Sequence, residues 1–158
     1  MSPPSPQRAI VVAVDLTEMT DVVVTTAAAY AAGANATVHA ICVIDPGHNP
    51  VAEQGRLDGE LEQLEQAVTR RIGRALTEAG VASEVHAHRG RPATEIVNLA
   101  KKTNAELIVL GRHSQTPVHP GFIGSVPMRI IGTAHCNVLV VQPPDWADAV
   151  SLRAPASH

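Results

Sequence analysis

Apolar residues gather in five short stretches, which are separated by longer segments with a different spacing. Four of these stretches are apolar along most of their length, as strands covered on both faces usually are. The stretch over 83–89 instead alternates apolar and polar residues, which is typical of a half-exposed strand. The pattern therefore predicts strands over 8–15, 37–44, 83–89, 107–110 and 138–141.

The segments between the strands carry helical signals. Thr20 and Asp21 can cap a helix that runs through an alanine-rich stretch and ends at Gly33. From Leu57 onward apolar residues recur every three or four positions until Gly80, which predicts an amphipathic helix with one buried stripe. The remaining helices are expected over 92–104 and from Ser125.

Strict alternation of strands and helices predicts the fold class. It is typical of an α/β protein, here a single-domain Rossmann-like open sheet of five parallel strands with helices on both faces. A length of 158 residues and a hydrophobic content of 45% suit one domain with a sizeable core. We expect the domain over 8–142, after a disordered leader over 1–7 and before a flexible C-terminal tail over 143–158.

Charge and composition exclude several kinds of partner and location. The net charge is −3 and the only lysines are Lys101 and Lys102, so no basic stripe is present for binding nucleic acid. The leader is rich in proline and serine and lacks an apolar core, so it reads as neither a signal peptide nor a membrane span. Cys42 and Cys136 are expected to be buried free thiols, which fits a reducing cytoplasm.

Two groups of residues could suggest a metal site. His86 and His88 share one face of the strand over 83–89, but we find no nearby carboxylate or cysteine to complete a tetrahedral set. Glu60, Glu62 and Glu65 belong to the charged face of the amphipathic helix, which is typical of solvated surface. We therefore expect no metal site.

The segment 107–141 has the features of a ligand cradle. Gly111 ends one apolar strand, and Gly124 and Ser125 come just before a short helix. A helix N-terminus carries unpaired N–H groups and partial positive charge, so Gly124, which lacks a Cβ, could let an anionic group such as phosphate approach closely. The same glycines are equally consistent with a plain strand end and a plain helix start.

Asp15 is expected at the carboxyl end of the first strand. That edge is where open α/β sheets bind ligands, so its carboxylate could accept a hydrogen bond from a sugar hydroxyl or a base. A turn or helix-capping role explains an aspartate at this position equally well.

Several landmarks over 8–142 together resemble the universal stress proteins. They are the first strand ending at Asp15, the Val-Ile-Asp-Pro run over 43–46, the Gly-Arg-Pro turn over 90–92 and the final Cys-Asn-Val-Leu-Val-Val run over 136–141. The ATP-binding branch of that family has glycine, two residues, glycine, nine residues, then glycine and serine or threonine. The matching positions here are Gly111, Ser114, Gly124 and Ser125, so the glycine motif is altered at one position.

The resemblance implies an adenine nucleotide as ligand, namely AMP, ADP or ATP, with or without magnesium. It places Asp15 near the adenine or ribose and a backbone contact to adenine at Val43. It places phosphate contacts in the loop after Gly111 and at the start of the last helix. The nucleotide-binding residues implied in this way are Ala13, Asp15, Thr17, Val43, Leu110, Gly111, His113, Ser114, Gly124, Ser125 and Val126.

The departures from the family pattern concern the phosphate end. Ser114 replaces a glycine, and Pro127 removes one N–H from the start of the last helix. The family's Asp-Gly-Ser after the first strand is Asp-Leu-Thr here, over 15–17. We therefore expect a preference for AMP or ADP over ATP. Arg112, His113 and His119 are available as further phosphate donors.

No catalytic motif accompanies the binding motif. The sequence has no Walker-type loop, no GxGxxG and no acid–base pair spaced to activate water, so we expect no enzyme activity.

Two functions remain open. One is a nucleotide-sensing regulator that is recognised by a partner such as a transporter, and the other is a nucleotide-free dimeric interaction module of the same fold. Both predict a homodimer through the apolar last strand over 138–141, with pairing into tetramers left open.

Overall fold

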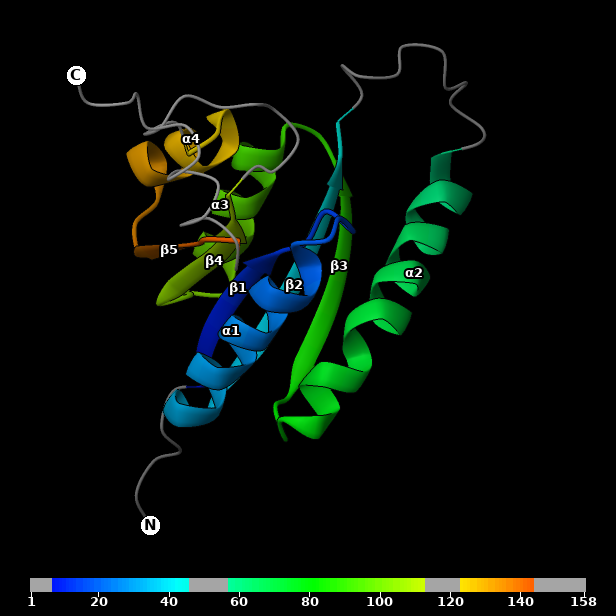
Figure 1. Ribbon diagram of the computed structural model, residues 1–158. Coiled ribbons are helices and arrows are strands. Elements are labelled where there is room, and N and C mark those ends of the chain that lie inside the picture. Colours follow the sequence, from blue (N-terminus) through cyan, green and yellow to red (C-terminus); the bar gives the residue numbers. More distant parts are fainter. Residues whose placement is uncertain (1–6, 46–56, 113–122, 144–158) are drawn as a thin grey trace, which may run out of the picture.

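A computed structural model describes residues 7–45, 57–112 and 123–143 (Figure 1). Its strands are β1 (Arg8–Ala13), β2 (Ala36–Ile44), β3 (Ser83–Arg89), β4 (Leu107–Gly111) and β5 (Asn137–Val141). Its helices are α1 (Thr20–Ala34), α2 (Leu57–Glu78), α3 (Pro92–Lys102) and α4 (Ser125–Thr133). The predicted leader and tail lie outside the described residues except for Gln7 and Pro143, and so stay predictions.

The five strands form one parallel sheet in the order β3-β2-β1-β4-β5. The chain first builds outward from β1 to β2 and β3, and then crosses to the other side of β1 to add β4 and β5. The strand order therefore reverses between β1 and β4, and the crossovers on either side of this point leave a crevice at the carboxyl ends of the strands. The predicted fold class is confirmed.

Helices cover both faces of the sheet (Figure 1). Residues of α1 and α2 share one hydrophobic core with the sheet, and residues of α3 and α4 share a second core on the opposite face. In β1, Val11 contributes to the α3/α4 core and Val12 to the α1/α2 core, and both are fully buried. This two-sided burial explains why the central strand is continuously apolar in sequence.

The predicted boundaries are wrong at the end of the first strand and at both ends of the first helix. Strand β1 ends at Ala13, and Val14 leaves the ladder while its N–H still donates to the Ile41 carbonyl at 2.9 Å. Helix α1 continues through Gly33 to Ala34, because Asn35 adopts the left-handed conformation (φ 51°) that ends it. The start of α1 also differs, since its N-cap is Met19 and no side chain caps it.

Over the described residues, no helix combines the length and the apolar content needed to cross a membrane.

Candidate functional site

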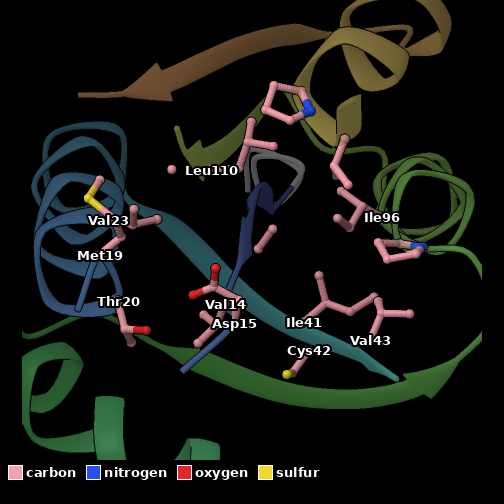
Figure 2. Close-up of a pocket in the computed structure, with 15 residues that line it drawn as sticks. Val14, Asp15, Met19, Thr20, Val23, Ile41, Cys42, Val43, Ile96 and Leu110 are labelled. Carbon is pink, nitrogen blue, oxygen red and sulfur yellow. The ribbon is translucent and has the colours of Figure 1, made fainter. Parts of the chain in front are cut away.

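A pocket opens at the carboxyl ends of β1, β2 and β4, at the point where the strand order reverses (Figure 2). Its volume is about 260 Å³. In Figure 2 the side chains of Met19, which is the N-cap of α1, and of Thr20 and Val23 in α1 lie on one side, and Ile96 of α3 lies on the other. The full lining is Ala13, Val14, Asp15, Met19, Thr20, Val23, Ile41, Cys42, Val43, Pro92, Ile96, Leu110, Gly111, Val126 and Pro127.

Asp15 supplies the pocket with an acceptor held in a defined orientation. Its Oδ1 atom accepts hydrogen bonds from the Thr17 backbone N–H at 3.0 Å and from the Thr17 hydroxyl at 2.7 Å. Leu16 between them has φ 59°, a conformation that strains a residue with a Cβ. The tight turn thus fixes an exposed carboxylate that lines the pocket, and it is also the turn role that the sequence left open for this aspartate.

The end of β2 forms a second wall of the pocket. Val43, predicted from the family resemblance, lines it together with Ile41 and Cys42, which the sequence did not single out as site residues. Burial raises the pKa of the Cys42 thiol to about 11, and the charge of Asp15 adds to the rise. Cys42 is therefore a neutral, apolar lining residue at physiological pH, and it fits the expected buried free thiol.

The end of β4 forms a third wall where the backbone comes close to α1. A Cβ built on Gly111 would lie 3.1 Å from Val23 Cγ2 and 3.4 Å from Met19 Cβ, so this position has little room for a side chain. Arg112, suggested above as a phosphate donor, is instead buried, and its Nη1 donates to Gln142 Oε1 at 3.2 Å. That pairing ties the guanidinium to the segment after β5 rather than to the pocket lining.

Helix α4 belongs to the connection from β4 to β5, and its start borders the pocket. Its N-cap, Gly124, has φ 106° and ψ 154°, a conformation that essentially only glycine adopts without strain. Val126 and Pro127 line the pocket, so the first turn of the helix faces it. The proline removes one of the N–H groups that a helix start would offer, as expected from sequence.

Six of the predicted binding residues line this one pocket, and they are Ala13, Asp15, Val43, Leu110, Gly111 and Val126. Thr17 does not line it but orients Asp15. Gly124 and Ser125 stand at the start of α4 without lining it. His113 and Ser114 lie outside the described residues.

Thr20 is a lining residue that sequence patterns did not reveal as part of the site. It is 1% exposed, and its hydroxyl oxygen has no hydrogen-bond partner among the described residues. A buried hydroxyl without a partner costs free energy, so such groups commonly await a ligand or a water. From sequence alone, a threonine in the first helical turn is interpreted as a capping residue, so its place in the pocket lining is not predicted.

The histidines of β3 have different partners from those expected. His88 Nδ1 lies 3.1 Å from Glu95 Oε2 of α3, whereas His86 Nε2 lies 3.2 Å from His39 Nδ1 of β2 and 3.7 Å from Glu84 Oε2. The expectation that no carboxylate lies near His86 is therefore wrong. It is wrong for His88 as well, because Glu84 shares the His86 face two residues earlier on β3 and α3 brings Glu95 to His88.

The fold and this crevice define the class of protein: an open α/β domain with a ligand pocket at its topological switch point. The universal stress protein family model matches residues 7–142. The chain belongs to the universal stress protein family.

Two curated relatives agree with this assignment. Universal stress protein MJ0531 of Methanocaldococcus jannaschii is 37% identical over 114 residues, which cover 70% of this chain and 67% of that protein. Universal stress protein A homolog 1 of Coxiella burnetii is 36% identical over 141 residues, which cover 84% of this chain and 94% of that protein.

Solved structures show the same fold at lower identity. Hypothetical protein MJ0577 has a TM-score of 0.75 at 23% identity, covering 89% of this chain and 99% of that one. A universal stress protein in complex with cAMP has a TM-score of 0.65 at 24% identity, with coverage of 87% and 98%. The Archaeoglobus fulgidus universal stress protein in complex with dAMP has a TM-score of 0.64 at 21% identity, with coverage of 85% and 98%.

Proposed function

We propose that this universal stress protein binds an adenine nucleotide in the switch-point pocket and acts as a regulatory sensing module rather than an enzyme. One observation carries the proposal: the oriented Asp15 carboxylate and the first turn of α4 border the same apolar crevice. A carboxylate can accept hydrogen bonds from a ribose or a base, and a helix start favours phosphate, so the two ends of the crevice match the two ends of a nucleotide.

The ligands of structural neighbours support the same ligand class. Two universal stress proteins of this fold are described in complex with cAMP and with dAMP, both adenine nucleotides with a single phosphate. The apolar walls formed by Val43, Ile41 and Ile96 suit a flat purine ring. On this basis adenine stacks between the end of β2 and α3, and the phosphate points toward α4.

The proposed preference for AMP or ADP over ATP rests on the phosphate side of the pocket. Pro127 lies in the pocket lining and lacks an N–H, so the first turn of α4 offers fewer donors to a phosphate chain. Arg112 is already bonded to Gln142 and is not one of the lining residues. A short phosphate group needs fewer donors than a triphosphate does.

Analysis of the purified protein tests nucleotide binding directly. The chain is denatured, and the released small molecules are separated by ion exchange against adenine nucleotide standards. Calorimetric titration of the nucleotide-free protein with AMP, ADP and ATP, with and without magnesium, then ranks the ligands. We expect AMP or ADP to bind more tightly than ATP. Tighter ATP binding would refute the preference, and no binding by any of the three would refute the sensing function.

A nucleotide-free interaction module is the alternative, and one observation favours it. Pro127 stands in the pocket lining and has no N–H, so the start of α4 offers fewer donors to a phosphate than an ordinary helix start does. If no nucleotide binds, this alternative becomes the function to test. Its assay is capture of a protein partner by the apo protein, compared with the same protein carrying the Asp15→Ala substitution.

We also propose a homodimer that pairs through the β5 edge of the sheet. Strand β5 is a terminal strand, and Met128 and Ile131 of the adjacent α4 are 55% and 51% exposed. Exposed apolar side chains beside a strand edge that is unpaired within the described ranges favour association with a second copy. Light scattering during gel filtration should give the mass of two chains, and Ile131→Lys should shift it toward one. A monomer mass for the unmodified chain at all concentrations would refute the dimer.

The absence of catalysis is tested with the same material. Incubation of the protein with ATP and magnesium should release no ADP above the rate seen with Asp15→Ala. A turnover that depends on Asp15 would refute the non-enzymatic assignment without affecting nucleotide binding.

A further inference from the structure

Strands β2 and β3 bring two histidines and a glutamate together on the face of the sheet that carries α3. His39 and Glu84 are direct partners in the β2–β3 register, and His86 follows Glu84 by two residues on the same face. The three ligand atoms, His39 Nδ1, Glu84 Oε2 and His86 Nε2, all lie within 4.8 Å of one another. None of the three residues lines the switch-point pocket.

The separations of these atoms have the dimensions of a metal site. His39 Nδ1 lies 3.2 Å from His86 Nε2 and 3.4 Å from Glu84 Oε2, and the remaining edge of the triangle is 3.7 Å. Zinc–nitrogen and zinc–oxygen bonds of about 2.0–2.2 Å at tetrahedral angles place ligand atoms about 3.4 Å apart. Octahedral angles would bring the same atoms to about 3.0 Å, so the observed triangle is closer to a tetrahedral ion.

We propose that His39, Glu84 and His86 form a zinc site that clips the edge strand β3 to β2, with a water as the fourth ligand. The residue types suit this ion, because imidazole nitrogens and a carboxylate oxygen are among the ligands that zinc uses in proteins. Only small movements are needed, since the side chains already converge from two hydrogen-bonded strands.

The burial of the two imidazoles favours the same assignment. The side chains of His39 and His86 are 13% and 24% exposed, so two of the ligands are held in place by packing, while Glu84 is 64% exposed and can adjust.

Space for the fourth ligand is present next to the cluster. His39 and Glu84 both line an open cavity of about 180 Å³, formed with residues of β1 and Thr103 at the end of α3. A water molecule fits there, and its access to solvent makes it exchangeable. The site would therefore stabilise the sheet edge while leaving one coordination position open.

Metal binding to the untagged, chelator-treated protein tests the proposal. Zinc is titrated by calorimetry into the unmodified chain and into His39→Ala, His86→Gln and Glu84→Gln. His88→Gln is the matched control, because His88 lies on the same strand face but pairs with Glu95. We expect one zinc per chain and a loss of affinity of roughly 100-fold or more for each ligand variant, since even outer-shell partners contribute 10–100-fold. His88→Gln should keep the full affinity.

Two further readouts separate this site from zinc bound elsewhere on the chain. Cobalt(II) in place of zinc should give the intense visible absorption of a tetrahedral complex, and Glu84→Gln should abolish it. Zinc should also raise the melting temperature of the unmodified protein and of His88→Gln, but not that of Glu84→Gln. The exposed position of Glu84 makes this variant safe for folding. Equal zinc affinity in the unmodified chain and in Glu84→Gln, or an octahedral cobalt spectrum, would overturn the proposal.

Discussion

Thr17 donates two hydrogen bonds to a single oxygen of Asp15, one from its backbone N–H at 3.0 Å and one from its hydroxyl at 2.7 Å. Both bonds go to Oδ1, and within the described residues Oδ2 accepts none, so Oδ2 remains the oxygen that can receive a ligand. Oδ1 therefore holds the turn, and Oδ2 is the oxygen proposed to bind the ligand.

Thr17→Val should weaken nucleotide binding without removing any residue from the pocket wall. The variant loses the hydroxyl that donates to Asp15 and accepts from the Met19 N–H at 3.3 Å. The carboxylate is then less well oriented, and we expect a loss of about 1 kcal/mol or roughly fivefold in affinity. Thr17→Ser keeps the hydroxyl and should bind like the unmodified chain. Calorimetry measures both, and equal affinities for the valine and serine variants would contradict the orienting role.

Thr20→Val should change stability and binding in opposite directions. The hydroxyl of Thr20 is buried without a partner among the described residues, so removing it spares a cost of about 1–3 kcal/mol in the ligand-free protein. If a nucleotide or its bound water uses this hydroxyl, the valine variant also binds less tightly. Urea unfolding and calorimetry measure the two effects, with Thr20→Ser as the control. A less stable Thr20→Val protein would show that the hydroxyl is satisfied in solution.

Gly111→Ala should damage both packing and binding. The new Cβ would meet Val23 Cγ2 at 3.1 Å and Met19 Cβ at 3.4 Å, so these α1-side residues must shift by a few tenths of an ångström at the pocket wall. We expect a destabilisation of about 1–3 kcal/mol and weaker nucleotide binding. Gly132→Ala in α4 is the control, because nothing lies within 4 Å of its Cβ position. That change should instead stabilise the protein by about 0.5–1 kcal/mol.

Leu16→Gly should relieve the strained turn that carries Asp15. Leu16 has φ 59°, so glycine removes the unfavourable Cβ contact, but it also gives up the covered part of a side chain that is 39% exposed. Leu16→Ala loses the same side chain but keeps the Cβ. We expect the glycine variant to be more stable than the alanine variant by about 1 kcal/mol. Chemical unfolding measures this difference, and a more stable alanine variant would show that the turn is not strained.

Cys42 should resist alkylation over an unusually wide pH range. Burial raises the pKa of this thiol to about 11, so it stays protonated as the pH rises through the ordinary cysteine range near 9.0, and its reactivity increases only as the pH approaches 11. A rise of this size leaves roughly 100-fold less thiolate at pH 8 than in the unfolded chain. Iodoacetamide labelling followed by mass spectrometry measures this, with the denatured protein as reference.

Bound nucleotide should slow the labelling of Cys42 further, because this thiol lines the pocket. Cys136 is the internal control, since it is less buried and lies outside the pocket lining. Labelling of Cys42 at the denatured rate would contradict its burial.

Much of the fold follows from local patterns of apolar and polar residues in the sequence. The continuous apolar run of β1 predicts a central strand because both of its faces are buried, and Val11 and Val12 show this burial. Asp15 and Gly111 were predicted at the carboxyl edge because they directly follow such runs, and both line the pocket. Boundaries were less certain, as at Gly33, because helix α1 ends where Asn35 adopts a left-handed conformation.

Periodicity alone thus determined which segments are strands and helices, their order, and the edge at which a ligand is expected. The tertiary structure decided which side chains meet. The proposed zinc site depends on the register that sets His39 opposite Glu84. The Thr20 hydroxyl, which has no hydrogen-bond partner among the described residues, depends on how α1 packs against the sheet. Register and packing result from the burial of whole elements against one another, so no local stretch of sequence encodes them.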